Sequence, residues 1–188
     1  MTVDPKQEPS QAGQGTGEYG VVIEPGTLRL ERVLPGPIER AWAYLTEPEK
    51  RGKWLARGQM ELRVGGRVEL KFRVAELSPD KTLPEDHKDC EISGQITRCE
   101  PSRLLSYTWN DGKGDLSEVT FELTPRAGDV LLVLTHRRLD DRAHLAGVAS
   151  GWHTHVGILI DCLSGREPRP FWATKVQMHA DYEKRLST

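Results

Sequence analysis

Alternating hydrophobic and polar residues predict an antiparallel sheet over the middle of the chain. Over residues 67–74 every second residue is apolar and those between are charged, so we expect one face of this strand to be buried and the other wet. Four more strands are predicted, because turn-forming residues separate four further apolar segments, at about 90–99, 103–110, 117–124 and 129–138. A first strand pair is predicted from residue 19 onward, with its turn at residues 25–26.

Apolar residues at intervals of three and four predict helices before and after this sheet. Two short helices are expected after the first strand region, and the second is expected to carry Trp54. A long helix is predicted to be capped by Asp140 or Asp141 and to run to about residue 164. Trp152 lies on the apolar stripe of this helix, which we expect to pack on the sheet.

The order of elements predicts an α+β fold, because the strands neither alternate with helices nor give way to a helical bundle. A length of 188 residues is typical of one domain, which we assign to residues 19–188. Residues 168–188 are expected to add an extra C-terminal helix after two prolines. Residues 1–18 are rich in Gly, Pro and Gln, with a single branched apolar residue, and are predicted to be a disordered tail.

The charge and the cysteines exclude several classes of protein. Lys and Arg total 26 against 28 for Asp and Glu, so there is no basic surface of the kind that binds nucleic acid. The longest apolar run, residues 130–134, is far below the roughly 18 residues that span a bilayer, so no membrane insertion is predicted and the cytoplasm is the expected compartment. Cys90, Cys99 and Cys162 form no CxxC pair, and neither a disulfide framework nor a zinc site is predicted.

Short segments spread along the chain carry a family resemblance. They are RVLPGPIERAW (32–42), LTEPE (45–49), Trp54, VGG (64–66), GQI (94–96), PSRL (101–104), YTW (107–109), TFEL (120–123) and GWH (151–153). Their order and spacing, over about residues 19–165, resemble the SRPBCC superfamily of START, Bet v 1-like and polyketide cyclase domains. More narrowly they resemble the activator of Hsp90 ATPase homologue 1-like family. The resemblance implies a helix-grip fold, in which six to seven antiparallel strands curve around a long C-terminal helix.

The same resemblance implies a cavity between sheet and helix, lined by apolar and aromatic side chains. Candidate ligand-binding residues lie on the predicted inner faces: Trp54, Met60, Leu70, Phe72, Ile92, Tyr107, Trp109, Phe121, Trp152, His155, Val156 and Leu159. Among them His155 is polar. It either offers one contact to a ligand or is a core histidine satisfied by a backbone group.

No catalytic residue, metal ligand or cofactor is predicted. His153 and His155 are two residues apart on the long helix and diverge by about 160°, whereas helical metal pairs are spaced by three or four. His136 is interpreted as a solvated strand end with surface ion pairs. No Gly-x-Ser-x-Gly elbow marks a hydrolase.

Three functions are compatible with this sequence. The first is a non-enzymatic protein that binds a small hydrophobic molecule, such as a lipid, an aromatic compound or a polyketide-like compound. The second is a chaperone-linked or regulatory protein-interaction module, in the stress-response setting that the resemblance implies. The third is a cyclase or dehydratase type of enzyme, with His155 or a carboxylate of the 76–89 loop as general base. The oligomeric state is left open.

Overall fold

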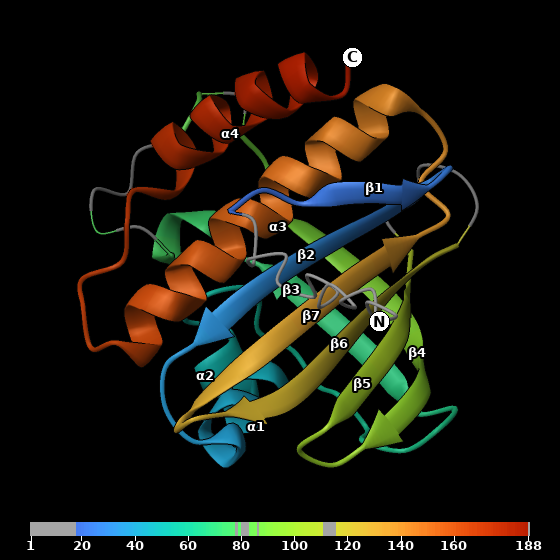
Figure 1. Cartoon of the computed structure of the whole chain (residues 1–188), viewed down its shortest axis with the longest axis vertical. Helices are drawn as coiled ribbons and strands as arrows, with labels where there is room; N and C mark the ends of the chain where they lie inside the picture. The colour runs from blue at the N-terminus through green and yellow to red at the C-terminus, as the bar shows by residue number, and fades with distance from the viewer. Residues whose placement is uncertain (1–17, 78, 80–82, 86, 111–115, 188) are drawn as a thin grey trace, which may run out of the picture.

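A curved antiparallel sheet organises the molecule (Figure 1). The computed structural model describes residues 18–187 except 78, 80–82, 86 and 111–115, so nearly all of the predicted tail lies outside the described residues. Within that part of the chain seven strands form one sheet in the order β1-β2-β7-β6-β5-β4-β3. Their bounds are β1 Val21–Glu24, β2 Thr27–Leu34, β3 Arg67–Phe72, β4 Cys90–Glu100, β5 Leu104–Trp109, β6 Ser117–Arg126 and β7 Asp129–Arg137. The predicted α+β helix-grip fold is confirmed.

One row of side chains across the sheet shows how its concave face is built. Leu30 on β2 lies opposite Leu134 on β7, and Leu134 lies opposite Phe121 on β6. Phe121 in turn pairs with Leu105 on β5. All four side chains belong to the buried core, because successive residues of a strand point to opposite faces and these share the inner one.

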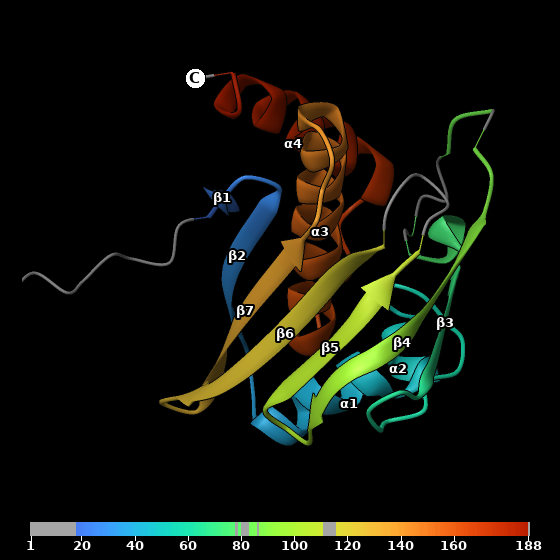
Figure 2. The same cartoon turned by 90° about the vertical axis from the view of Figure 1, so that its right-hand side faces the viewer.

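Four α-helices complete the described fold: α1 Ile38–Thr46, α2 Pro48–Arg51, α3 Arg142–Leu163 and α4 Phe171–Arg185, with a short 3-10 helix, η1, at Val74–Glu76. Figure 2 shows α3 inside the curve of the sheet, α4 beside it, and α1 and α2 at one end of the sheet. The side chain of Asp141 caps α3 by accepting a hydrogen bond from the backbone N–H of His144, 2.8 Å away. The helix ends before Gly165, whose φ of +67° suits glycine.

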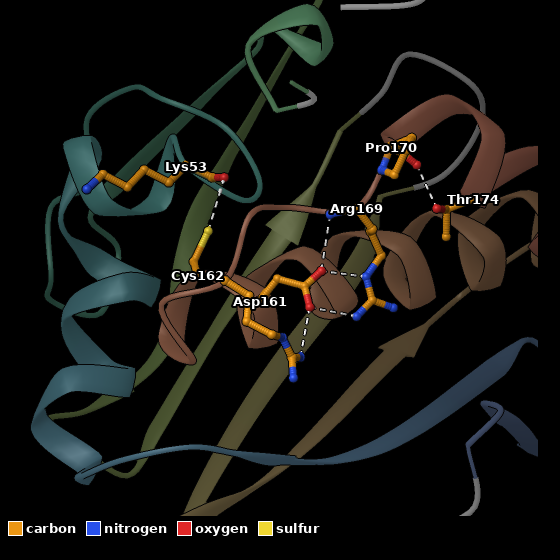
Figure 3. Close-up of polar contacts among 7 residues, drawn as sticks. Lys53, Asp161, Cys162, Arg169, Pro170 and Thr174 are labelled. Carbon is orange, nitrogen blue, oxygen red and sulfur yellow. Dashed lines mark hydrogen bonds and ion pairs between the residues drawn. The ribbon is translucent and has the colours of Figure 1, made fainter. Parts of the chain in front are cut away.

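The face of α3 that points away from the sheet is also buried, because Asp161 ties the next segment to it (Figure 3). Its carboxylate accepts hydrogen bonds from Arg169 Nε at 2.7 Å and from Arg166 at 2.9 Å. Burial raises the pKa of Asp161, but these hydrogen bonds outweigh burial and leave the pKa below its ordinary value. Gly157 leaves room for the Arg169 guanidinium, since a Cβ there would lie 2.7 Å from its Nη1.

Arg51 holds together the segment that follows α2. It is fully buried, and its guanidinium donates hydrogen bonds to the carbonyl oxygens of Ala56 at 3.1 Å and Thr46 at 2.9 Å, and to that of Gly58. The chain therefore turns around this side chain, and α2 ends at Arg51. Trp54, which was expected within this helix, follows it.

We predict that Arg51→Met lowers the free energy of unfolding by about 3 kcal/mol or more, because a buried polar group without a partner costs roughly 1–3 kcal/mol. Urea unfolding followed by circular dichroism measures the change. Arg103→Met is the matched control: Arg103 is exposed and paired with Glu100, so its loss is expected to cost under about 1 kcal/mol. Equal losses in the two variants would contradict this role of Arg51.

Candidate functional site

An open pocket of about 570 Å³ lies between the N-terminal half of α3 and the sheet. We call it the α3 pocket. Phe72 at the end of β3, Ile92 on β4 and Trp109 at the end of β5 form its sheet side, and Trp152 and His155 form its helix side. Lys175 reaches it from α4. The volume lies within the range of roughly 300–1,000 Å³ that is typical of small-molecule sites.

Glycines on α3 leave this space open. Positions 147, 148, 151, 152 and 155 recur at intervals of three and four, so they share the face of α3 that lines the pocket. A Cβ added at Gly147 or Gly151 would meet no atom within 4 Å. The missing side chains therefore contribute directly to the volume between helix and sheet.

Aromatic rings form most of the wall. Trp109 and Trp152 meet edge to face with ring centroids 5.3 Å apart, and Phe72 lies 5.9 Å from Trp109. Phe121 supports Trp152 from the core at 5.6 Å. Such edge-to-face pairs stabilise one another beyond their burial, so the rings hold a fixed surface for a ligand.

A chain of hydrogen bonds fixes Trp152 to the sheet. The indole N–H of Trp152 donates to Nδ1 of His136 at 2.9 Å, so Nδ1 carries no proton. Nε2 of His136 must then carry the proton, and it donates to Oγ of Ser117, also at 2.9 Å. Ser117 in turn donates to the carbonyl oxygen of Trp109 at 3.3 Å. Each polar atom in this series of hydrogen bonds therefore has a partner, although the imidazole of His136 is buried.

The interpretation of His136 as a solvated strand end is therefore wrong. His136 is 1% exposed, and its ring lines the α3 pocket. Arg137 and Arg138 follow His136 and suggested an exposed strand end. However, β7 includes Arg137, and the alternation of side chains along the strand turns His136 inward.

His155 is a second buried imidazole with a defined tautomer. Its Nδ1 lies 2.7 Å from the carbonyl oxygen of Trp54, which can only accept, so Nδ1 carries the proton and Nε2 is an acceptor. Phe72 and Phe171 pack against the ring at 6.0 and 5.0 Å. The ring is thus satisfied by a backbone group on one side and lines the pocket.

His153, two residues earlier, faces different partners from His155. Its Nδ1 lies 3.1 Å from the hydroxyl of Tyr182 on α4. Among the residues that the structure describes, no group of three or more His, Cys, Asp or Glu side chains is arranged to hold a metal ion.

No helix in the described ranges has the length and apolar character that crossing a membrane requires.

Charged side chains surround the α3 N-terminus at the pocket. Asp140 and Asp141 line it together with His144, whose Nδ1 lies 3.8 Å from the carboxylate of Asp140. Lys175 on α4 also lies over the ring of Trp172, 5.7 Å from its centroid. The pocket therefore combines an aromatic wall with charges of both signs.

The structure brings five of the predicted ligand-binding residues to the α3 pocket: Phe72, Ile92, Trp109, Trp152 and His155. The other seven do not line it: Trp54, Met60, Leu70, Tyr107, Phe121, Val156 and Leu159. Six of these seven are buried in the core, and Met60 packs beside it half-buried. Val156 and Leu159 belong to the C-terminal half of α3, where core side chains fill the space between helix and sheet.

Further residues line the pocket that the sequence did not single out as ligand contacts: Leu55, Cys90, His136, Asp140, Asp141, Ala143, His144, Gly147, Val148, Gly151 and Lys175. The helical period could have found Gly147, Val148 and Gly151, which share a face with Trp152. No sequence signal pointed to Lys175, because its place depends on how α4 packs against α3.

Comparisons with known proteins agree with this fold. A family model described as "Activator of Hsp90 ATPase homolog 1-like protein" matches residues 35–164, which run from just before α1 to just after α3. No curated protein matches the chain.

Several solved structures resemble most of the chain. The protein encoded by gene BPP1335 from Bordetella parapertussis is 40% identical with a TM-score of 0.76, and the match covers 95% of each chain. Protein MLL2253 from Mesorhizobium loti is 27% identical with a TM-score of 0.60, over 74% of this chain and 97% of that one. CalU16 from Micromonospora echinospora is 22% identical with a TM-score of 0.66, over 86% and 89%, and shows the shared fold alone.

The buried histidines predict how stability depends on pH. Burial lowers the pKa of His136 to about 3 and that of His155 to about 4, against an ordinary value of about 6.5 in the unfolded chain. As the pH falls below about 6.5 the unfolded chain takes up protons that the folded protein does not. The stabilisation is therefore complete above this pH and is lost progressively toward the folded-state values.

We predict that His136→Phe reduces the slope of unfolding free energy against pH between pH 6 and pH 5 by about 1 kcal/mol per pH unit, because one proton fewer is linked to unfolding. Urea unfolding of both proteins at a series of pH values measures the slope. The comparison concerns slopes, so a uniform loss of stability in the variant does not affect it. A slope that the substitution leaves unchanged would show that His136 is not held neutral.

Proposed function

Because the chain belongs to the family of activator of Hsp90 ATPase homolog 1-like proteins, we propose that it is a cytoplasmic, non-enzymatic protein that binds a small hydrophobic molecule in the α3 pocket. The observation that carries the proposal is the pocket itself, about 570 Å³ in volume with an aromatic wall. The ligand class that suits it is an aromatic, lipid or polyketide-like molecule.

Burial of apolar surface would drive binding. Each Å² of apolar surface removed from water contributes about 25 cal/mol before the costs of ordering the ligand are subtracted. Phe72, Trp109 and Trp152 present ring surface whose positions are set by mutual contacts and by the hydrogen bond to His136. Little of the binding energy would be spent on arranging the site.

The pocket favours ligand binding over a module that acts only through protein contacts. Such a module needs no interior space, and filling the pocket would stabilise it by burying more apolar surface. Gly147 and Gly151 instead keep the space open, at a cost in helix propensity of up to about 1 kcal/mol each. A chaperone-linked or regulatory partner remains the alternative proposal.

His155 meets one requirement of the cyclase or dehydratase alternative, since it lines the pocket and has a displaced pKa. Burial moves that pKa down to about 4, however, so its imidazole is a weaker base than an ordinary histidine, whereas a general base works best near the operating pH. In the 76–89 loop, Glu76 pairs with Arg57 and Asp89 with Arg73. Neither of these carboxylates lines the pocket, and Glu85 of the same loop does not line it either. Residues 80 and 86 lie outside the described residues. The properties of His155 fit binding better than proton transfer.

We predict that Gly151→Leu weakens the binding of apolar probes at least tenfold, because the new side chain enters the pocket. Gly151→Ala is the matched control: it gives a similar gain in helix propensity but adds only one methyl group, so it should bind nearly as the wild type does. Titration calorimetry and thermal shift with naphthalene, a flavone and dodecanol measure the effect. The proposal fails if no probe binds the wild type, or if the Leu and Ala variants bind equally.

A further inference from the structure

The polar atoms on the pocket wall differ in whether they remain available to a ligand. His136 uses both ring nitrogens, one for Trp152 and one for Ser117, and the indole N–H of Trp152 is used by the same contact. These groups can pack against a ligand but have no hydrogen-bonding capacity left for it. They contribute shape rather than polar recognition.

His155 is different, because only one of its nitrogens is used. Nδ1 donates to the carbonyl oxygen of Trp54, which leaves the lone pair of Nε2 as an acceptor. No hydrogen bond joins Nε2 to any residue of the described ranges. Nor does it belong to the buried unpartnered atoms of those ranges, which are Arg29 Nε and His87 Nε2. Nε2 therefore stays open on a ring that lines the pocket.

The surroundings of His155 specify what kind of molecule can reach this acceptor. Phe72 lies 6.0 Å from the imidazole and 5.9 Å from Trp109, so the three rings are neighbours along one part of the wall. Phe171 covers the imidazole from another direction at 5.0 Å. A group that approaches Nε2 from the pocket thus belongs to a molecule whose body rests on aromatic rings.

We propose that the α3 pocket selects flat aromatic molecules that carry a hydrogen-bond donor, such as a phenolic hydroxyl, which donates to Nε2 of His155. This inference rests on the proposed function and names its ligand class. A ligand with only an ether or carbonyl oxygen at that position would set lone pair against lone pair. It would also leave a largely desolvated acceptor unpaired, which is how sites built around a polar group reject analogues that lack the matching group.

Three neutral probes of nearly equal size test this selection at pH 7.5: 2-naphthol, 2-methoxynaphthalene and naphthalene. We expect the wild type to bind 2-naphthol about tenfold more tightly than 2-methoxynaphthalene by titration calorimetry. Apolar burial alone favours the methyl ether, so a preference for the phenol must come from its O–H group. Neutral probes keep the charges of Asp140, Asp141 and Lys175 out of the comparison.

Two variants assign the preference to His155. His155→Phe keeps a ring but removes the acceptor. We expect the ratio of the affinities for 2-naphthol and 2-methoxynaphthalene to fall to one or below in this variant, whatever its affinity for naphthalene. His155→Gln can donate to the Trp54 carbonyl through its amide N–H and accept through its oxygen, so it should retain part of the preference.

A spectroscopic measurement on the wild type keeps the proposal testable if His155→Phe does not fold. With ¹⁵N-labelled histidine, 2-naphthol should shift the Nε2 resonance of His155 in the direction expected for a nitrogen that accepts a hydrogen bond, and 2-methoxynaphthalene should not. Saturable binding of all three probes with equal affinity and no such shift would overturn the selection and leave the proposed function standing. Failure of all three to bind would contradict the proposed function itself.

Discussion

The structure depends on one geometric constraint: a single sheet must curve enough to hold one helix along its length. C-terminal to Trp152 the helix presents Val156 and Leu159, both fully buried, and the concave face of the sheet packs against them. N-terminal to Trp152 the helix presents Gly147 and Gly151, which have no side chains to fill the space between helix and sheet. Core and pocket are therefore the packed half and the open half of one helix–sheet contact, and the indole ring of Trp152 lies between them.

Polar groups inside this interior are tolerated because each is placed where its hydrogen-bonding capacity is used or exposed to the pocket. His136, fixed between Trp152 and Ser117, is held as one neutral tautomer, since a second ring proton would meet the indole N–H. His155 is held neutral in the opposite tautomer by the Trp54 carbonyl. A desolvated polar group without a partner costs free energy. For the same reason, Nε2 of His155 would favour a ligand that carries a hydrogen-bond donor.

Local patterns predicted the fold well because strands, turns and caps are encoded within a few residues. The alternating strand that begins at Arg67, the turn at residues 25–26 and the cap at Asp141 all appear in the structure, although β3 ends at Phe72 and Val74 begins the 3-10 helix η1. Periodicity does not separate pocket from core. Phe72, Trp109 and His155 line the pocket, whereas Tyr107 and Leu159 share their inward-facing pattern and lie in the packed core. Periodicity tells which face a residue occupies; the depth of packing on that face depends on distant segments such as α1 and α4.

The central claim is that the space between α3 and the sheet is open to an apolar molecule, and a crystal structure of the protein soaked with 1-bromonaphthalene tests it most directly. Anomalous scattering locates the bromine without reference to any assumed pose. We expect a bromine peak among Phe72, Trp109 and Trp152, with their rings where the hydrogen bonds and ring contacts place them. A structure in which those rings close on one another, with no bromine between helix and sheet, would contradict it.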